Sequence, residues 1–268
     1  MEDNIVYFIT GANKGIGLHL TRTLLLRPNT TVISTQRTPN LDTLPTTLSS
    51  LTAAPGSKLI IIPLEFCTSD TGVHKNTVSD LVFRLENEGV HHIDTIILNA
   101  GAATSFRSVA ETDISEVQAH FEINTLWPIQ IWQVLRGLLV GGVKGEEVPV
   151  QTKKKTQKKM IYISSALGSI TSMHDATPSL AYGISKAGAN FFVRKVHFEE
   201  DRGVVALAVH PGWVKTHNGQ FFADSVGVKE PPMSLEDSVD GILRQIDNST
   251  RETTSGSFVS WNGDVIPW

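Results

Sequence analysis

The chain of 268 residues has a hydrophobic fraction of 40% and a charged fraction of 19%, values typical of an ordinary globular protein and not of a disordered or membrane chain. Its formal net charge of −4 at pH 7 argues against a nucleic-acid partner. Residues 1–4 carry two acids and no base, and no apolar run could span a bilayer, so we expect no secretory signal and no membrane partner.

Cysteine and histidine usage narrows the chemistry further. The single cysteine, Cys67, excludes an internal disulfide and fits a reducing compartment, which predicts a cytoplasmic protein. The histidines His91, His92, His174 and His210 do not have the spacing of metal ligands on a helix, so we predict no metal site.

Strand and helix patterns alternate along the chain, which is typical of an α/β fold with a parallel sheet. We predict a single Rossmann domain over residues 1–268, with a doubly wound sheet of seven strands and helices on both faces. The expected strands are 5–9, 31–35, 59–64, 93–98, 160–163, 204–209 and 256–261, and the expected helices are 16–26, a short one within 38–57, 73–88, 115–139, 182–198 and 235–246.

The first strand leads into a glycine-rich turn. Residues 10–17 read T-G-A-N-K-G-I-G between an apolar run and a helical pattern. Glycines in such a turn let a pyrophosphate approach the helix N-terminus, where free N–H groups favour an anion. A plain glycine-rich connector is the alternative. The expected cofactor contacts here are Gly11, Asn13, Lys14, Gly15, Ile16 and Gly17.

The second strand is followed by Arg37, and no acid lies between Val32 and Leu41. At this place in a dinucleotide-binding fold an acid accepts from the ribose 2′-hydroxyl, whereas a base accommodates a 2′-phosphate. Arg37, together with Lys14, therefore predicts NADPH as the cofactor in preference to NADH. The alternative is that Arg37 is only a solvated surface charge.

Two further strand ends and a long helix carry polar candidates. The fourth strand delivers Asn99 and then two small residues, which permit close approach of a ligand. The helix at 115–139 contains Asn124, whose alternative reading is a satisfied core amide, and Pro128, which we expect to kink it. Residues 141–159 are rich in glycine and lysine and predict a solvated basic loop. The strand-end candidates are Glu65, Phe66, Asn99, Ala100 and Gly101.

The fifth strand brings Ser165 to the same edge, and the next helix carries Tyr182 and Lys186. Residues at i and i+4 share one face of a helix. A lysine charge beside a phenol favours the phenolate, and a shift of about 3 pKa units would make the tyrosine an acid–base catalyst at neutral pH. A surface helix that happens to carry both residues is the alternative.

The sixth strand ends in a Pro-Gly pair, and residues 217–232 show no clear period, which favours a mobile substrate flap. We expect cofactor contacts from Pro211, Gly212, Val214 and Thr216.

Taken in order, residues 10–17, 99–101, Asn124, Ser165 and the Tyr182-x-x-x-Lys186 pair resemble the short-chain dehydrogenase/reductase family in its classical form across nearly the whole chain. Residues 171–186, 193–195 and 252–256 resemble its fungal norsolorinic acid ketoreductase-like branch.

The resemblance implies a role for each matched residue. Tyr182 would protonate the carbonyl oxygen, and Lys186 would lower the tyrosine pKa and hold the nicotinamide ribose. Ser165 would bind the substrate oxygen, and Asn124 would position a water that links Lys186 to solvent. Glu65 stands where the family usually has Asp, and the interval between Ser165 and Tyr182 is longer than usual, so we expect an enlarged loop between them, beside the substrate pocket.

These observations predict an NADPH-dependent ketoreductase acting on a bulky apolar or aromatic ketone, because Met173, Trp213, Phe221 and Phe222 flank the catalytic edge. Alternatives are an alcohol dehydrogenase working in the oxidative direction and a non-catalytic nucleotide sensor. A sugar-nucleotide epimerase or dehydratase would need a larger C-terminal domain than this chain has. From the resemblance we also expect a homodimer or homotetramer, paired through the helices at 115–139 and 182–198.

Overall fold

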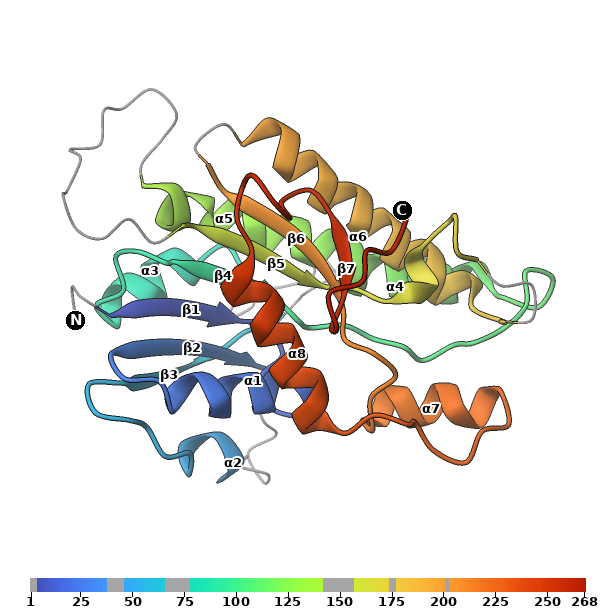
Figure 1. Cartoon of the computed structure of the whole chain (residues 1–268), viewed down its shortest axis with the longest axis horizontal. Helices are drawn as coiled ribbons and strands as arrows, with labels where there is room; N and C mark the ends of the chain where they lie inside the picture. The colour runs from blue at the N-terminus through green and yellow to red at the C-terminus, as the bar shows by residue number, and fades with distance from the viewer. Residues whose placement is uncertain (1–3, 38–45, 66–77, 142–156, 174–176, 201–202) are drawn as a thin grey trace.

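The structure, a computed structural model, describes residues 4–37, 46–65, 78–141, 157–173, 177–200 and 203–268. In this part of the chain, one parallel sheet of seven strands has the order β3-β2-β1-β4-β5-β6-β7 (Figure 1). This arrangement confirms the predicted α/β class. The strands are β1 (Ile5–Ile9), β2 (Thr30–Gln36), β3 (Lys58–Pro63), β4 (Thr95–Leu98), β5 (Lys159–Ile163), β6 (Val205–His210) and β7 (Phe258–Ser260).

The sheet reverses its winding direction at β1. Ile5 lies opposite Thr30 of β2, and Tyr7 lies opposite Thr95 of β4. The chain therefore winds outward to β3, returns past β1 and continues outward to β7. Open sheets of this kind leave a crevice for ligands beyond the carboxyl ends of the strands where the order reverses.

Helices cover both faces of the sheet, and each face has its own apolar core (Figure 1). On one face α1 and α8 bury residues such as Leu20 and Ile242, and on the other α5 and α6 bury Leu135 and Val193. Most strand residues are apolar, as predicted for a sheet covered on both sides, although β2 also buries threonine and serine side chains. The helices are α1 (Gly15–Leu25), α2 (Thr46–Ser49), α3 (Leu81–Asn87), α4 (Ile114–Phe121), the π-helix η1 (Glu122–Leu126), α5 (Trp127–Val140), the 3₁₀ helix η2 (Ala166–Gly168), α6 (Leu180–Glu199), α7 (His217–Ser225) and α8 (Leu235–Asn248).

The helix expected at 115–139 is confirmed as a continuous helical stretch over 114–140, but its middle turn, residues 122–126, is π-helical. Pro128 lies in the first turn of α5 and has no N–H to donate to the carbonyl four residues earlier. A π turn adds one residue to the helical repeat and often occurs at functional sites. The kink expected at Pro128 is therefore a local change of helix type that begins at Glu122.

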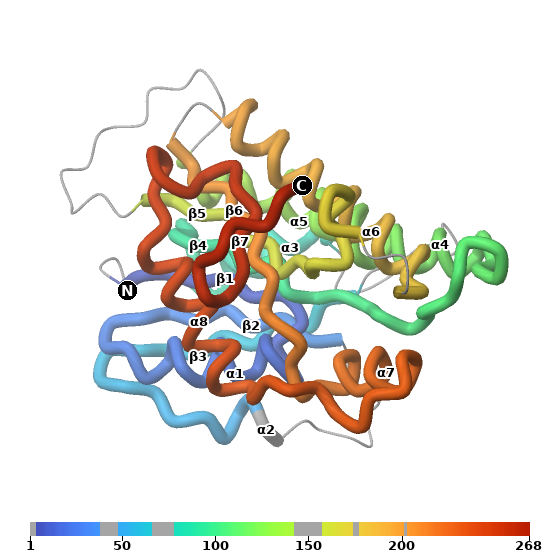
Figure 2. The backbone as a smooth tube through the Cα atoms, turned by 45° about the vertical axis from the view of Figure 1, so that its right-hand side comes forward, coloured from blue at the N-terminus to red at the C-terminus, as the bar shows by residue number. Residues whose placement is uncertain are grey.

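The expectation of an irregular flap over 217–232 is also corrected, because residues 217–225 form α7. Thr216 caps this helix, since its Oγ1 accepts from the N–H of Gly219 at 3.0 Å. Gly219 obscures the helical pattern in the sequence, yet a Cβ there would lie 2.0 Å from the Val214 carbonyl oxygen. Figure 2 shows α7 carried away from the sheet, below the loop that leads from β4 to α4.

The prediction of a solvated basic loop over 141–159 is wrong at the end of this range and stays untested over the rest of it. Lys159 is the first residue of β5, and its Nζ donates to the Ile246 carbonyl. Lys158 donates to Asp94 at 2.7 Å. Residues 142–156 lie outside the described residues. Two of the lysines expected to be solvated therefore anchor the start of a strand.

Two other helices are shorter than the sequence predicts. The helix expected at 73–88 begins only at Leu81, after the non-helical residues 78–80, and α2 spans only 46–49. Residues 38–45 and 66–77 lie outside the described residues. A bilayer-crossing helix is absent from the described part of the chain, where each helix is too short or too polar.

Asp94 links three strands at the amino-terminal edge of the sheet. Its carboxylate accepts from the Val6 N–H at 2.8 Å and from Lys158 at 2.7 Å, and His92 lies 3.4 Å away. Burial alone would raise the pKa of Asp94, but the hydrogen bonds from His92, Lys158 and Val6 together lower it to about 2. The ionised carboxylate is therefore the form that the fold stabilises.

We predict that Asp94→Asn lowers the free energy of unfolding at pH 7 by about 2 kcal/mol, the equivalent of the pKa shift. Because the folded pKa lies below the ordinary value, the contribution is complete above about pH 4 and is lost as the pH falls toward about 2. Urea denaturation of both proteins across this range measures the difference.

Glu230→Gln is the matched control, because it removes an exposed ion pair with Lys215 that is worth about 0.5 kcal/mol at most. Equal effects of the two substitutions would contradict the assignment.

Candidate active site

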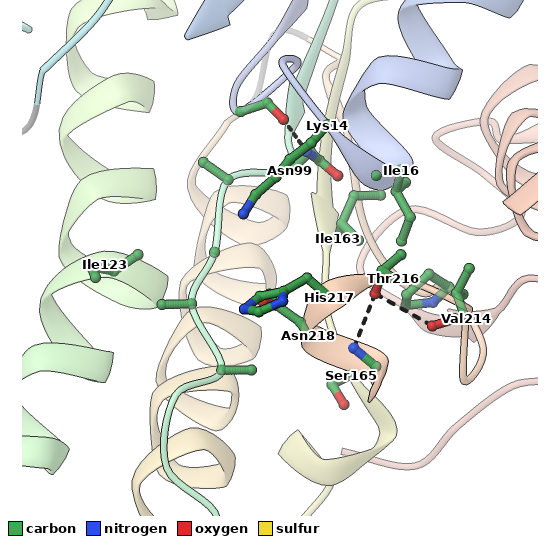
Figure 3. Close-up of a pocket in the computed structure, with 18 of the residues that line it drawn as sticks. Lys14, Ile16, Asn99, Ile123, Ile163, Ser165, Val214, Thr216, His217 and Asn218 are labelled. Carbon is green, nitrogen blue, oxygen red and sulfur yellow. Dashed lines mark hydrogen bonds between the residues drawn. The ribbon is translucent and has the colours of Figure 1, made fainter. Parts of the chain in front are cut away.

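A cavity of about 860 Å³ lies beyond the carboxyl ends of the strands. The loops after β1, β2, β4, β5 and β6 line it, together with the first turns of α1 and α7 and the side of α6. Figure 3 shows Lys14, Ile16 and Asn99 around one part of this cavity and Ser165, Thr216 and His217 around another. Both groups of predicted residues, those for a nucleotide and those for catalysis, therefore face one space.

The glycine-rich turn fits tightly against the loop that follows β4. Gly11 has a φ of +65°, and a Cβ on it would lie 3.0 Å from the Ala100 Cα. A Cβ on Gly17 would lie 2.4 Å from the Gly11 carbonyl oxygen. The turn therefore requires glycine at both positions, and the amino end of α1 stays open to the cavity.

Hydrogen bonds hold these two loops together. The Thr10 hydroxyl accepts from the N–H groups of Asn99 at 3.0 Å and of Ala100 at 2.9 Å. The Asn99 side chain donates to the carbonyl oxygens of Thr10 and Gly11. Asn99 is thus a structural link between the loops as well as a lining residue of the cavity.

Lys14 and Arg37 line the nucleotide part of the cavity together with Gln36. Within the described ranges, neither cation forms an ion pair with a carboxylate. The Oε1 atom of Gln36 is buried and has no hydrogen-bond partner there. This part of the cavity therefore offers two cations and one unused polar atom to a ligand.

Ser165, Tyr182 and Lys186 meet where β5 and α6 face the cavity. The Lys186 Nζ donates to the Ile163 carbonyl at 2.9 Å and lies 5.7 Å from the centre of the Tyr182 ring. The Ser165 Oγ accepts from the Leu167 N–H at 3.2 Å. The helix places the phenol and the ammonium on one face, as their spacing predicts.

Burial moves the two ionisable groups in opposite directions. It raises the pKa of Tyr182 to about 12, although a hydrogen bond to Ser165 opposes the shift, and it lowers the pKa of Lys186 to about 7. The expectation that the lysine lowers the tyrosine pKa is therefore not met in this structure. Desolvation disfavours the phenolate and the ammonium alike, and it is the largest cause of both shifts. The phenol is thus held in its protonated form.

Asn124 does not line the cavity but lies fully buried behind it. Its Oδ1 accepts from the Ala102 N–H, and its Nδ2 donates to the Ala102 carbonyl and to the Ser185 hydroxyl, each at 2.9 Å. Its own carbonyl oxygen accepts from the Tyr162 hydroxyl. The amide is therefore satisfied within the protein, and it joins η1 to the loop after β4 and to α6.

His210 is a lining residue that we did not predict. Its Nδ1 accepts from the Ala166 N–H at 3.1 Å, and burial lowers its pKa to about 4, so the imidazole is neutral and able to accept. The contact holds the turn that carries Ser165. The position of His210, at a strand end directly before Pro211 and Gly212, is the signal that could have revealed it.

Aromatic side chains close the cavity beside Tyr182. The Phe106 ring centre lies 5.6 Å from that of Tyr182 and 4.8 Å from that of Phe222, and Trp213 lies 5.1 Å from Phe222. Phe106 escaped prediction because nothing in its local sequence marks it. Of the four residues predicted to shape the substrate pocket, Trp213 and Phe222 line the cavity, whereas Phe221 packs on Phe106 and Met173 is 72% exposed.

Most of the predicted site residues line the cavity, with four exceptions. Asn124 and Gly17 support it from behind, Glu65 is not among its lining residues, and Phe66 lies outside the described residues. His217 and Asn218 were not predicted, and Figure 3 shows both reaching into the cavity from the start of α7. The remaining predicted residues that line it are Gly11, Asn13, Lys14, Gly15, Ile16, Arg37, Asn99, Ala100, Gly101, Ser165, Tyr182, Lys186, Pro211, Gly212, Val214 and Thr216.

Comparison with known proteins agrees with this geometry. The chain matches the short chain dehydrogenase family over residues 5–225. It is 36% identical to the norsolorinic acid ketoreductase of Aspergillus parasiticus, over 99% of this chain and 92% of that protein. The NADPH-bound carbonyl reductase from chicken fatty liver has a TM-score of 0.76 at 25% identity, with 99% of this chain and 95% of that chain covered. The carbonyl reductase Sniffer of D. melanogaster has the same fold, with a TM-score of 0.78 at 23% identity and with 99% and 100% covered. These matches confirm the resemblance seen in the sequence, and the chain belongs to the short-chain dehydrogenase family.

Proposed function

We propose that this protein is an NADPH-dependent ketoreductase that reduces a bulky apolar or aromatic ketone to a secondary alcohol. The observation that carries the proposal is the meeting of Ser165, Tyr182 and Lys186 in the same cavity as the glycine-rich turn. A ketone that becomes an alkoxide needs hydrogen-bond donors aimed at its oxygen and a source of a proton. These three residues supply both.

Each of the three has a distinct task in this proposal. The bound nicotinamide cofactor supplies the hydride. The Ser165 hydroxyl donates a hydrogen bond to the carbonyl oxygen of the substrate, and the Tyr182 hydroxyl gives its proton to that oxygen. A pKa of about 12 keeps the Tyr182 phenol protonated at neutral pH, which is the form that reduction requires. Lys186 holds the nicotinamide ribose and lies beneath the phenol.

NADPH is the proposed cofactor because Lys14 and Arg37 both line the nucleotide part of the cavity. A guanidinium can bind a 2′-phosphate through paired donors. The carbonyl reductase from chicken fatty liver, which has the same fold, was solved with NADPH bound. The residues of the turn also fit the group, since Gly11 and Gly17 let the turn pack against Ala100 and Asn99 and so leave the amino end of α1 open to a pyrophosphate.

The proposed substrate class rests on the aromatic wall formed by Phe106, Trp213 and Phe222 next to Tyr182. Aromatic rings favour offset or edge contacts with other rings, so this wall suits an aryl ketone better than a small charged keto acid. Several similar fungal proteins are named norsolorinic acid ketoreductases, which supports a role in fungal secondary metabolism. Within this proposal the protein works in the cytoplasm.

We also propose that the protein is a homodimer or homotetramer that pairs through α6. Ile184, Phe191 and Phe198 are 48%, 70% and 65% exposed and stand seven residues apart. Positions with this spacing follow one stripe along a helix. A stripe of large apolar side chains on the surface marks an interaction site more often than chance exposure does.

The function is tested by measuring NADPH-dependent turnover of a panel of aryl and alicyclic ketones beside small keto acids. We expect turnover of the aryl ketones, and we expect Tyr182→Phe to lower kcat by a factor of about 10² or more with little change in NADPH affinity, because only the transferred proton is lost. A Phe variant that kept a tenth of the wild-type kcat, or a strong preference for keto acids, would contradict the proposal.

The two reaction directions should differ in their dependence on pH. Oxidation of the alcohol needs the phenolate, so its kcat should rise about tenfold per pH unit from about pH 7 to about pH 10, while kcat for reduction stays level. The reason is the raised pKa of Tyr182, about 12. A plateau in oxidation above about pH 8 would instead indicate that Lys186 lowers the tyrosine pKa in the loaded enzyme.

The cofactor assignment predicts a preference in kcat/KM for NADPH over NADH of about 10- to 100-fold, since charge-assisted hydrogen bonds contribute roughly 1.5–3 kcal/mol. Arg37→Asp should reverse this preference, whereas Arg22→Asp, on the exposed side of α1, should leave it unchanged. Steady-state kinetics with both cofactors decides between these outcomes. Equal use of the two cofactors by the wild type would refute the assignment.

For the oligomer, light scattering of the wild type at micromolar concentration should give the mass of a dimer or tetramer. Phe191→Glu should give a monomer, because a charge cannot be buried without a partner. Phe83→Glu is the control, since Phe83 is 66% exposed but lies on α3. A monomeric wild type would contradict the proposed oligomer.

A further inference from the structure

A fully buried tyrosine lies directly behind the proposed catalytic residues. Tyr162 belongs to β5, and its side chain has no exposed surface. Its hydroxyl donates to the Asn124 carbonyl oxygen at 2.9 Å. Burial of a hydroxyl is costly unless it finds a partner, so this bond fixes the orientation of the ring.

The Asn124 carbonyl is available for this bond because of the local helix geometry. In an α-helix the oxygen would accept from the N–H four residues later, but that residue is Pro128, which has none. The π-helical turn η1 contains Asn124 and ends just before α5 begins. Because of the proline and the π turn, the Asn124 carbonyl oxygen can accept a hydrogen bond from a side chain of β5.

The face of the same ring contacts Lys186. The Lys186 Nζ lies 4.6 Å from the centre of the Tyr162 ring, within the range of an attractive cation–π contact. The nitrogen also donates to the carbonyl of Ile163, the residue after Tyr162. Two successive residues of β5 therefore hold the ammonium, one with its backbone and one with its ring.

We propose that Tyr162 is a positioning residue for Lys186: its ring supports the ammonium, and its hydrogen bond to Asn124 fixes the ring. The inference rests on the proposed role of Lys186. It also changes the role expected for Asn124, whose side chain is engaged by Ala102 and Ser185. In this inference Asn124 supports Lys186 indirectly, because its carbonyl oxygen accepts from the hydroxyl of the tyrosine that contacts the ammonium.

Several other groups lie around the Lys186 ammonium. Tyr182 lies on the same helix, 5.7 Å from Nζ by its ring centre, and His120 of α4 contacts the edge of Tyr182. His210, at the end of β6, shares the cavity. The loop after β4 contributes the backbone of Gly101, where an added Cβ would lie 3.5 Å from Nζ. Tyr162 is distinguished from these groups by its distance, because its ring centre lies 4.6 Å from Nζ whereas that of Tyr182 lies 5.7 Å away.

The test compares Tyr162→Leu, which removes the ring, with Tyr162→Phe, which keeps the ring and loses the hydroxyl. The pH dependence of Lys186 acetylation in the protein without cofactor, read by mass spectrometry, gives the midpoint of its titration. We expect Tyr162→Leu to lower this midpoint by about one pH unit and Tyr162→Phe to move it by less than about 0.3. Phe8→Leu, which removes a fully buried ring from β1, should lower the thermal midpoint without moving the titration.

Kinetics with NADPH provides a second readout. Tyr162→Leu should raise the KM for NADPH about tenfold, and Tyr162→Phe should stay within about threefold of the wild type, since a contact of this kind changes equilibria by about that factor. If Tyr162→Leu does not fold, Tyr162→Met fills a similar volume without an aromatic face and serves in its place.

A folded Leu or Met variant with the wild-type titration midpoint would overturn the inference, whatever the enzyme reduces. A shifted midpoint in a protein that turns over no ketone would leave the inference standing and refute the proposed function. The experiments therefore test the role of Tyr162 and the proposed ketoreductase function independently.

Discussion

The geometry of the site depends on one set of hydrogen bonds, those that join the loops after β1 and β4. These strands are neighbours in the sheet, but their helices leave on different sides, so their loops must part to open a crevice. The Thr10 hydroxyl and the Asn99 amide hold the loops together at their base. These bonds hold Gly11 close to Ala100, and the first residues of α1 line the cavity beside them.

Desolvation is the second constraint, and it affects three ionisable groups that line the cavity. Tyr182, Lys186 and His210 all have pKa values shifted toward the neutral form, to about 12, about 7 and about 4. For Tyr182 the shift keeps a proton available for transfer. For His210 it keeps the imidazole able to accept the Ala166 N–H. For Lys186 the same burial opposes the charge that the mechanism uses, and this explains why contacts that stabilise the ammonium matter more here than at a surface lysine.

The sequence predicts those parts of the fold and site that depend on residues close together in the chain. The apolar runs and the turn at residues 10–17 predict strand, turn and helix, because apolar periodicity and glycine-rich turns are specific local signals of these elements. Phe106 and Tyr162 could not be found in this way, because their partners Phe222 and Lys186 are far away in the chain. The π turn at 122–126 also escapes, since it differs from an α-helix by a single residue per turn and has no composition of its own.

The residues proposed for chemistry and those proposed for substrate choice stand on different elements. Ser165 lies just after β5, and Tyr182 and Lys186 belong to α6, which packs on the sheet. Phe222 belongs to α7, which Figure 2 shows standing away from the sheet. The start of α7 is held by the Thr216 cap and by a hydrogen bond from Trp213 to the Gly219 carbonyl. Beyond that turn, the described aromatic contacts of α7 with the rest of the site are those to Phe106 and Trp213. Such contacts are weak individually, at about 0.5–1.5 kcal/mol each. Substitutions on α7 can therefore change which ketone fits while the proton donor and its supporting lysine stay in place.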